Sequence, residues 1–119
     1  MSKKLFISLP MNGISEVDIL TTRDTIYQAM TKVGDFELLE TYFRDDPPAN
    51  AGRLWYLGRS VQDLSRADLV IFAPNWNTAK GCVVEHLICE VYKIPYIHWA
   101  ETTDGVIKLM TERYSDDLK

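Results

Sequence analysis

The chain has 119 residues and carries 13 Lys and Arg against 17 Asp and Glu, which gives a formal charge of -4 at pH 7. This length suits a single domain over residues 1–119, and such an acidic chain is not expected to bind a nucleic-acid polymer, because phosphates attract a basic face. The hydrophobic fraction of 46% argues against global disorder, and no apolar run approaches the roughly 18 residues that cross a membrane.

Short apolar runs alternate with stretches of helical periodicity along the chain. The first run ends at Pro10, and Ser15 with the acids behind it marks a helix start. In chain order the predicted elements are a strand over 5–9, a helix over 15–34, a strand over 36–42, a loop over 44–52, a helix over 53–66, a strand over 68–74, a loop over 75–80, a helix over 81–92, a strand over 95–99 and a helix over 105–114.

Repeated β-α units predict the α/β class, with a small doubly wound parallel sheet of four or five strands, flavodoxin- or Rossmann-like, and helices on both faces. After Asp68 the run as far as residue 74 is continuously apolar, as expected for a strand covered on both sides. The predicted core-facing residues of the first two helices are Ile19, Thr22, Ile26, Met30, Val33, Leu54, Leu57, Val61 and Leu64. Ligands of such sheets bind outside the carboxyl ends of the strands, so segments 8–13, 43–52 and 75–85 are expected to converge there.

Several common α/β functions lack their motifs in this sequence. There is no G-x-x-x-x-G-K-[ST], G-x-G-x-x-G or G-x-S-x-G, which argues against a P-loop NTPase, a dinucleotide-binding domain and an α/β-hydrolase. No cofactor is expected.

The two cysteines, Cys82 and Cys89, fall about two turns apart on one predicted helix, which puts their Cα atoms roughly 10 Å apart and out of disulfide reach. With His86 they share one helix face, but a zinc site needs a fourth ligand, so two buried structural thiols are the preferred interpretation and no metal is expected. The apolar run after Lys4 is too short for a signal peptide, and the cytoplasm is the predicted compartment.

Glu85 is the main candidate for chemistry. It lies near the start of a helix at the ligand-binding edge, four residues after Gly81, whose missing side chain lets a ligand approach the backbone. The helix dipole is expected to favour its charged form, which suits a nucleophile. On position alone, a carboxylate that only caps the helix is the more common alternative.

Three further residues are candidates for a structural role or for the site. Asp68 is expected to hold the start of a strand on the side away from ligands, whereas Asp63 could join Glu85 in a carboxylate pair for glycosidic-bond chemistry. Trp76 follows a strand, where its ring is equally suited to stacking on a nucleobase and to packing in the core.

Three stretches of the chain together resemble the nucleoside 2-deoxyribosyltransferase superfamily. They are Ile7-Ser8-Leu9-Pro10-Met11-Asn12-Gly13, Asp63-Leu64-Ser65-Arg66-Ala67-Asp68-Leu69-Val70, and Gly81-Cys82-Val83-Val84-Glu85 ahead of Lys93-Ile94-Pro95. Leu-Pro-Met-Asn-Gly together with Pro74-Asn75-Trp76 resembles, more narrowly, a branch common in phages and prophages that is known as DUF4406. The superfamily also includes hydrolases of 2-deoxynucleoside 5′-monophosphates.

The resemblance implies hydrolysis or transfer at the N-glycosidic bond of a nucleoside or its 5′-monophosphate. The family's catalytic glutamate falls on Glu85 and its accompanying aspartate on Asp63. The residues implied to contact the substrate are Ser8, Pro10, Met11, Asn12, Gly13, Arg44, Trp76 and Gly81. The resemblance also implies a homodimer or larger homo-oligomer, because relatives complete their sites with a neighbouring subunit.

The sequence departs from the family pattern at two places. Relatives carry Asp or Ser six residues before the glutamate, where this chain has Ala79, and the first loop has no arginine, for which Arg44 or Lys80 are candidate substitutes. Two alternatives therefore stay open: a module that binds a nucleotide ligand without catalysis, and a protein-interaction domain with an inert pocket.

Overall fold

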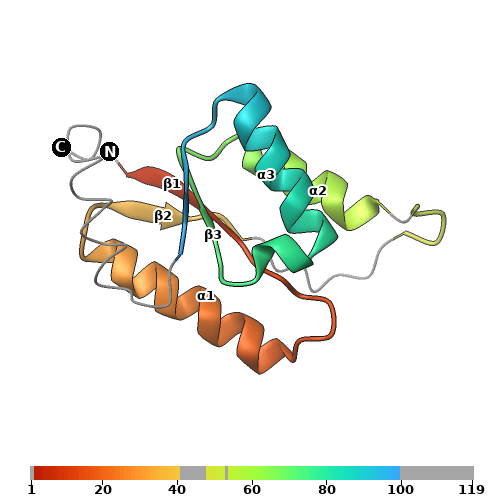
Figure 1. Cartoon of the computed structure of the whole chain (residues 1–119), viewed down its shortest axis with the longest axis horizontal. Helices are drawn as coiled ribbons and strands as arrows, with labels where there is room; N and C mark the ends of the chain where they lie inside the picture. Colours follow the sequence, from red (N-terminus) through yellow and green to blue (C-terminus); the bar gives the residue numbers. More distant parts are fainter. Residues whose placement is uncertain (1, 41–47, 53, 100–119) are drawn as a thin grey trace.

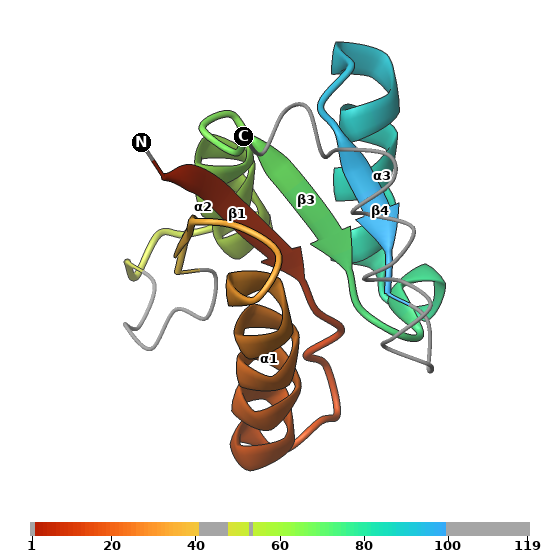
Figure 2. The same cartoon turned by 90° about the vertical axis from the view of Figure 1, so that its left-hand side faces the viewer.

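The computed structural model describes residues 2–40, 48–52 and 54–99. Its centre is a parallel sheet of four strands, β1 (Lys3–Ser8), β2 (Phe36–Leu38), β3 (Leu69–Phe72) and β4 (Tyr96–His98). The strands lie in the order β2-β1-β3-β4, and every neighbouring pair is parallel. Figure 1 labels β1, β2 and β3, and Figure 2 shows β4 beside β3. The predicted α/β fold with a parallel sheet is confirmed.

Three helices cover the two faces of this sheet: α1 (Glu16–Thr31), α2 (Trp55–Leu64) and α3 (Lys80–Tyr92). Helix α1 lies on one side of the strands and α2 and α3 lie together on the other (Figure 2). Alternation along β1 explains the two layers, since Leu5 and Ile7 pack with the α1 residues while Phe6 packs with Leu64 and Cys89. All four residues of β3 are buried, as predicted for a strand covered on both faces.

The first helix begins as the sequence predicts. The backbone N–H of Asp18 donates to Ser15 Oγ at 3.2 Å, which satisfies one of the free donors of the first turn. Of the predicted core-facing residues, Ile19, Ile26 and Met30 are buried.

Two predicted elements differ from the structure. Strand β2 ends at Leu38, whereas the sequence predicts a strand as far as residue 42. Residues 41 and 42 lie outside the described part of the chain. Helix α2 starts at Trp55, so Leu54 precedes it and is 64% exposed instead of facing the core. The predicted helix over 105–114 and most of the loop over 44–52 also lie outside the described residues.

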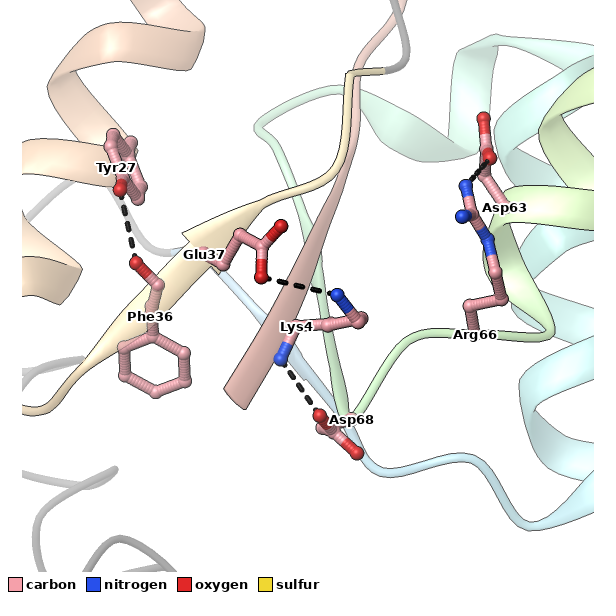
Figure 3. Close-up of polar contacts among 7 residues, drawn as sticks. All are labelled: Lys4, Tyr27, Phe36, Glu37, Asp63, Arg66 and Asp68. Carbon is pink, nitrogen blue, oxygen red and sulfur yellow. Dashed lines mark hydrogen bonds and ion pairs between the residues drawn. The ribbon is translucent and has the colours of Figure 1, made fainter. Parts of the chain in front are cut away.

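The amino-terminal edge of the sheet is held by polar contacts (Figure 3). The Lys4 N–H donates to Asp68 Oδ2 at 2.7 Å, and the Asp68 N–H donates to the Lys4 carbonyl at 2.8 Å, which confirms the structural role predicted for Asp68. Lys4 Nζ also pairs with Glu37 at 3.1 Å, and Tyr27 donates to the Phe36 carbonyl at 3.0 Å. Within the described residues, no helix is long and apolar enough to cross a membrane.

Candidate functional site

A cavity of about 800 Å³ opens at the carboxyl edge of β1 and β3. Its wall comes from the end of β1 with the loop that follows, from α2, and from the loop after β3 with the first two turns of α3. The lining residues are Phe6, Ile7, Ser8, Leu9, Pro10, Met11, Asn12, Ile14, Tyr56, Leu57, Ser60, Asn75, Thr78, Ala79, Lys80, Gly81, Cys82 and Glu85. Segments 8–13 and 75–85 therefore converge as predicted.

Glu85 lies on the inner side of α3 and is only 6% exposed, yet it forms part of the cavity wall. Ser8, the last residue of β1 and 2% exposed, donates its hydroxyl proton to Glu85 Oε1 at 2.8 Å. This bond joins residues 77 positions apart in the sequence. It fixes the orientation of the carboxylate at the end of a strand, where a rigid element positions it.

The electrostatics of Glu85 correct the expectation from the helix dipole. Burial raises the pKa of the Glu85 carboxyl to about 7, and the hydrogen bond from Ser8 opposes that rise. Glu85 is the sixth residue of α3, and the dipole acts mainly on the first turn. Desolvation therefore outweighs the helix dipole and favours the neutral form of Glu85.

Cys82 shares this environment. Burial raises the pKa of its thiol to about 11, with a hydrogen bond to Ser8 opposing the rise and the Glu85 charge adding to it. Because the thiolate is the reactive form of cysteine, Cys82 has the character of a structural side chain. Both Cys82 and Cys89 are free and buried, as the preferred interpretation of the sequence has it.

The first loop supplies one wall of the cavity. Pro10, Met11 and Asn12 line it, as predicted from the family resemblance. Gly13 is next in the chain and has φ +78°, a conformation that favours glycine, so its contribution is to turn the loop toward α1.

The start of α3 supplies the opposite wall. Ala79 precedes the helix and offers no side-chain cap, so the N–H groups of its first turn lack a partner from that position. The first intrahelical bond runs from Val83 N to Ala79 O at 3.0 Å. Lys80 and Gly81 both line the cavity, and a Cβ built on Gly81 meets nothing within 4 Å. This end of the cavity is suited to an anionic group.

Asp63 is placed differently from its prediction. It does not line the cavity; its carboxylate accepts a hydrogen bond from Arg66 one turn further along the chain (Figure 3). Helix α2 leads down from the carboxyl edge and ends ahead of β3, so each turn carries it away from the cavity. The residue of α2 that lines the cavity at this depth is Ser60, and the contact shown for the Asp63 carboxylate is with Arg66.

Trp76 also has another role. It does not line the cavity but packs on Phe72, with ring centroids 5.4 Å apart, and lies flat on His86 at 4.2 Å and 10°. This is the core role that the sequence left equally open. Arg44 lies outside the described residues.

The predicted site segments do not include Ile14, Leu57 and Ser60, which also line the cavity. Tyr56 of α2 lines the cavity as well. The signal for the α2 residues is depth along the helix, because only its first turns lie near the carboxyl edge of the sheet. Asn75 has φ 66°, a left-handed conformation that asparagine tolerates, and this turns the chain into the wall.

A metal site does not form at the residues that suggested one. His86 contacts His98 rather than the two cysteines, with their Nε2 atoms 2.8 Å apart. Over the described residues, no group of three or more His, Cys, Asp or Glu side chains is placed to hold a metal ion.

Comparison with known proteins adds support for the fold. No family model matches the chain, and no curated protein matches it. Among solved structures it is similar to a conserved protein from Enterococcus faecalis V583, with a TM-score of 0.66 and 15% sequence identity over 95% of this chain and 76% of the other. At that identity the likeness shows a shared α/β architecture alone.

Proposed function

We propose that this protein cleaves or exchanges the N-glycosidic bond of a nucleoside or deoxynucleoside, or of its 5′-monophosphate, with Glu85 as the nucleophile. The observation that carries the proposal is the Glu85 carboxylate in the cavity wall, held through Oε1 by Ser8 at 2.8 Å. The superfamily resemblance at Ser8 to Gly13 and at Gly81 to Glu85 supports the same assignment.

The chemistry follows from the environment of that carboxylate. With Oε1 held by Ser8, Oε2 attacks C1′ of the sugar, the C1′–N bond breaks, and its electron pair leaves with the base. The buried anion is destabilised in the free protein, and positive charge developing at C1′ offsets that cost in the transition state. Water then cleaves the glycosyl ester in a hydrolase, and a second base does so in a transferase.

The remaining walls suggest how the substrate lies. A 5′-phosphate is proposed to bind at Lys80 and the uncapped first turn of α3, where the helix dipole favours an anion. Relatives carry Asp or Ser at the position of Ala79, next to this turn. The base is proposed to lie against the apolar side of the cavity at Met11, Ile14 and Tyr56.

A second candidate is a module that binds the same ligand without turning it over. The specific observation in its favour is that Asp63 faces Arg66, so the second family carboxylate does not reach the cavity. Titration calorimetry with 2-deoxynucleosides and their monophosphates separates the two: heat of binding without product over long incubation favours the module.

The deciding experiment is chromatographic product analysis over a panel of deoxynucleosides and 5′-monophosphates, with and without an acceptor base. Glu85→Gln should lower the rate by about 10³-fold or more, because an amide is no nucleophile at C1′. Asp63→Asn should keep the rate within about threefold, since its partner is Arg66.

Glu37→Gln is the matched control, with the same chemical change at an exposed carboxylate on β2. Unchanged turnover in Glu85→Gln contradicts the proposed mechanism. Loss of turnover in Glu37→Gln as well would mean that the effect is not specific to the cavity.

We also propose that the protein acts as a homodimer in the cytoplasm. The outer face of α3 supports the dimer, because Val83, Leu87 and Val91 are exposed and recur every four residues. A two-fold axis at Leu87 pairs each Val83 with the partner copy's Val91, an isologous contact. Leu87→Glu should give a monomer by light scattering, and a wild-type monomer would contradict this. The free thiols fit a reducing compartment.

A further inference from the structure

The two histidines of the chain form one pair at the end of the sheet. His86 of α3 and His98 of β4 approach each other with Nε2 atoms 2.8 Å apart. Their ring centroids are 5.0 Å apart and the planes differ by 22°. The centroid separation is close to the nitrogen separation plus the two ring radii, so the imidazoles meet head to head in an N–H···N hydrogen bond.

Three aromatic rings contact this pair. Trp76 lies flat across both imidazoles, at 4.2 Å and 10° from His86 and at 5.0 Å and 19° from His98. Phe72 of β3 and Tyr96 of β4 contact His86 at an angle, with centroids 4.9 Å and 4.7 Å away. The indole therefore packs on a surface that exists only while the two rings stay paired.

Only one proton fits between the two Nε2 atoms. Glu90 Oε1 lies 3.5 Å from His86 Nδ1, which favours a proton on Nδ1 and leaves Nε2 as the acceptor, so His98 donates. Glu90 also accepts from the Tyr96 hydroxyl at 3.2 Å. Among the described residues that pack on the pair, the titratable side chains are Glu90 from α3 and Tyr96 from β4, while β3 and the turn after it contribute Phe72 and Trp76.

A second proton would place two N–H groups head on. Burial lowers the pKa of His98, the charge of His86 lowers it further, and Glu90 opposes both. Protonation of both imidazoles therefore removes the acceptor nitrogen and breaks the N–H···N hydrogen bond.

The pair also adjoins the cavity. Trp76 begins the short 3-10 turn Trp76–Thr78, its carbonyl accepts from Ala79 N at 3.1 Å, and its own N–H donates to the Ala73 carbonyl at 3.2 Å. Asn75, Thr78 and Ala79 from this segment line the cavity. The stack of Trp76 on the histidines is thus the contact by which β4 and α3 hold that wall.

We propose that the His86–His98 pair under Trp76 is a pH-dependent switch. The hydrogen-bonded pair holds the cavity wall over residues 75–79 in place, and the wall becomes mobile when both imidazoles are protonated. The proposal concerns the order of the wall and is independent of the reaction assigned to Glu85.

The test is an NMR titration of the full chain from pH 8 to pH 5 without added ligand. With two histidines and three tryptophans in the chain, the imidazole C–H and indole N–H signals are few enough to assign. We expect His98 to take up its proton below the ordinary histidine pKa of 6.5, and the Trp76 indole and the 75–79 amides to shift as it does so.

Two variants complete the test. His98→Gln keeps a hydrogen-bonding group but takes up no proton, so the acid shift of the 75–79 amides should disappear. Glu85→Gln should retain that shift, because it leaves the histidines unchanged. The proposal is overturned if His98 titrates at or above 6.5, if His98→Gln keeps the wild-type shift, or if Glu85→Gln abolishes it.

Discussion

Two consecutive residues of α3 take part in two contrasting polar pairs. Glu85 turns toward β1 and is held by Ser8 in the cavity wall, whereas His86 turns toward β4 and meets His98 beneath Trp76. Burial is the largest cause of the pKa shift in both pairs, and in both it favours the neutral form. Neighbouring residues of one helix therefore contact two groups whose pKa values shift in opposite directions, Glu85 itself and His98 of β4.

The same physical cause has opposite consequences when the pH falls. A neutral carboxyl is protonated, so acid relieves the desolvation cost of Glu85, and its contribution to stability falls as the pH rises from 4.5 to about 7. A neutral imidazole is deprotonated, so acid charges His98 against its surroundings, and its contribution falls as the pH drops below 6.5. In the wild-type protein these two changes of stability with pH therefore oppose each other between pH 4.5 and pH 6.5.

Replacing Glu85 should remove its pH-dependent contribution to stability and leave that of His98. This is the largest change in stability that we expect. A carboxyl whose pKa is about 7 when folded and 4.5 when unfolded costs about 3 kcal/mol once ionised. The free energy of unfolding of Glu85→Gln, relative to wild type, should therefore rise by about 3 kcal/mol between pH 4.5 and pH 8. Urea unfolding at several pH values measures this difference.

The same urea unfolding series shows how His98 alone makes the stability depend on pH. In the Glu85→Gln variant, the stability should decrease on acidification below pH 6.5, where the wild-type curve is flatter. A difference between the two proteins that does not vary with pH would show that the Glu85 carboxylate is solvated in the folded state.

Removing the hydroxyl of Ser8 is expected to have a smaller effect on the same pair. Ser8→Ala leaves Glu85 Oε1 without its donor, which should cost about 2 kcal/mol at pH 9, where Glu85 is ionised, and less at pH 4.5. Because the Ser8 hydrogen bond lowers the pKa of Glu85, its loss should raise that pKa above 7 and move any pH–rate profile to higher pH. A Ser8→Ala profile that coincides with that of wild type would show that the bond does not form in solution.

Sequence reasoning reached the fold because local patterns and topology agree. The apolar run at β3 and the Ser15 start of α1 each specify an element, and parallel connections then bring Ser8 and Glu85 to one edge of the sheet. Placing Glu85 there needed only the rule that loops after parallel strands converge.

The parts it missed depend on depth and packing. Asp63 and Ser60 lie on one helix one turn apart, and only the three-dimensional course of α2 shows which of them reaches the cavity. Similarly, the environment of Trp76 depends on His86 and His98, which come from different elements. The pKa of Glu85 depends on burial, which a helix position in the sequence does not reveal.

The smallest predicted effect concerns Ala79, at the start of α3. Ala79 occupies the capping position without a side-chain acceptor, so Ala79→Ser should add a hydrogen bond to an N–H of the first turn and raise the free energy of unfolding by about 1 kcal/mol. The same hydroxyl would occupy the donors proposed for a 5′-phosphate. Thermal unfolding with and without a deoxynucleoside monophosphate distinguishes the two effects: a higher Tm without ligand tests the cap, and a smaller ligand-induced rise than in wild type indicates that these N–H groups bind the phosphate. An unchanged ligand-induced rise would place the phosphate elsewhere in the cavity.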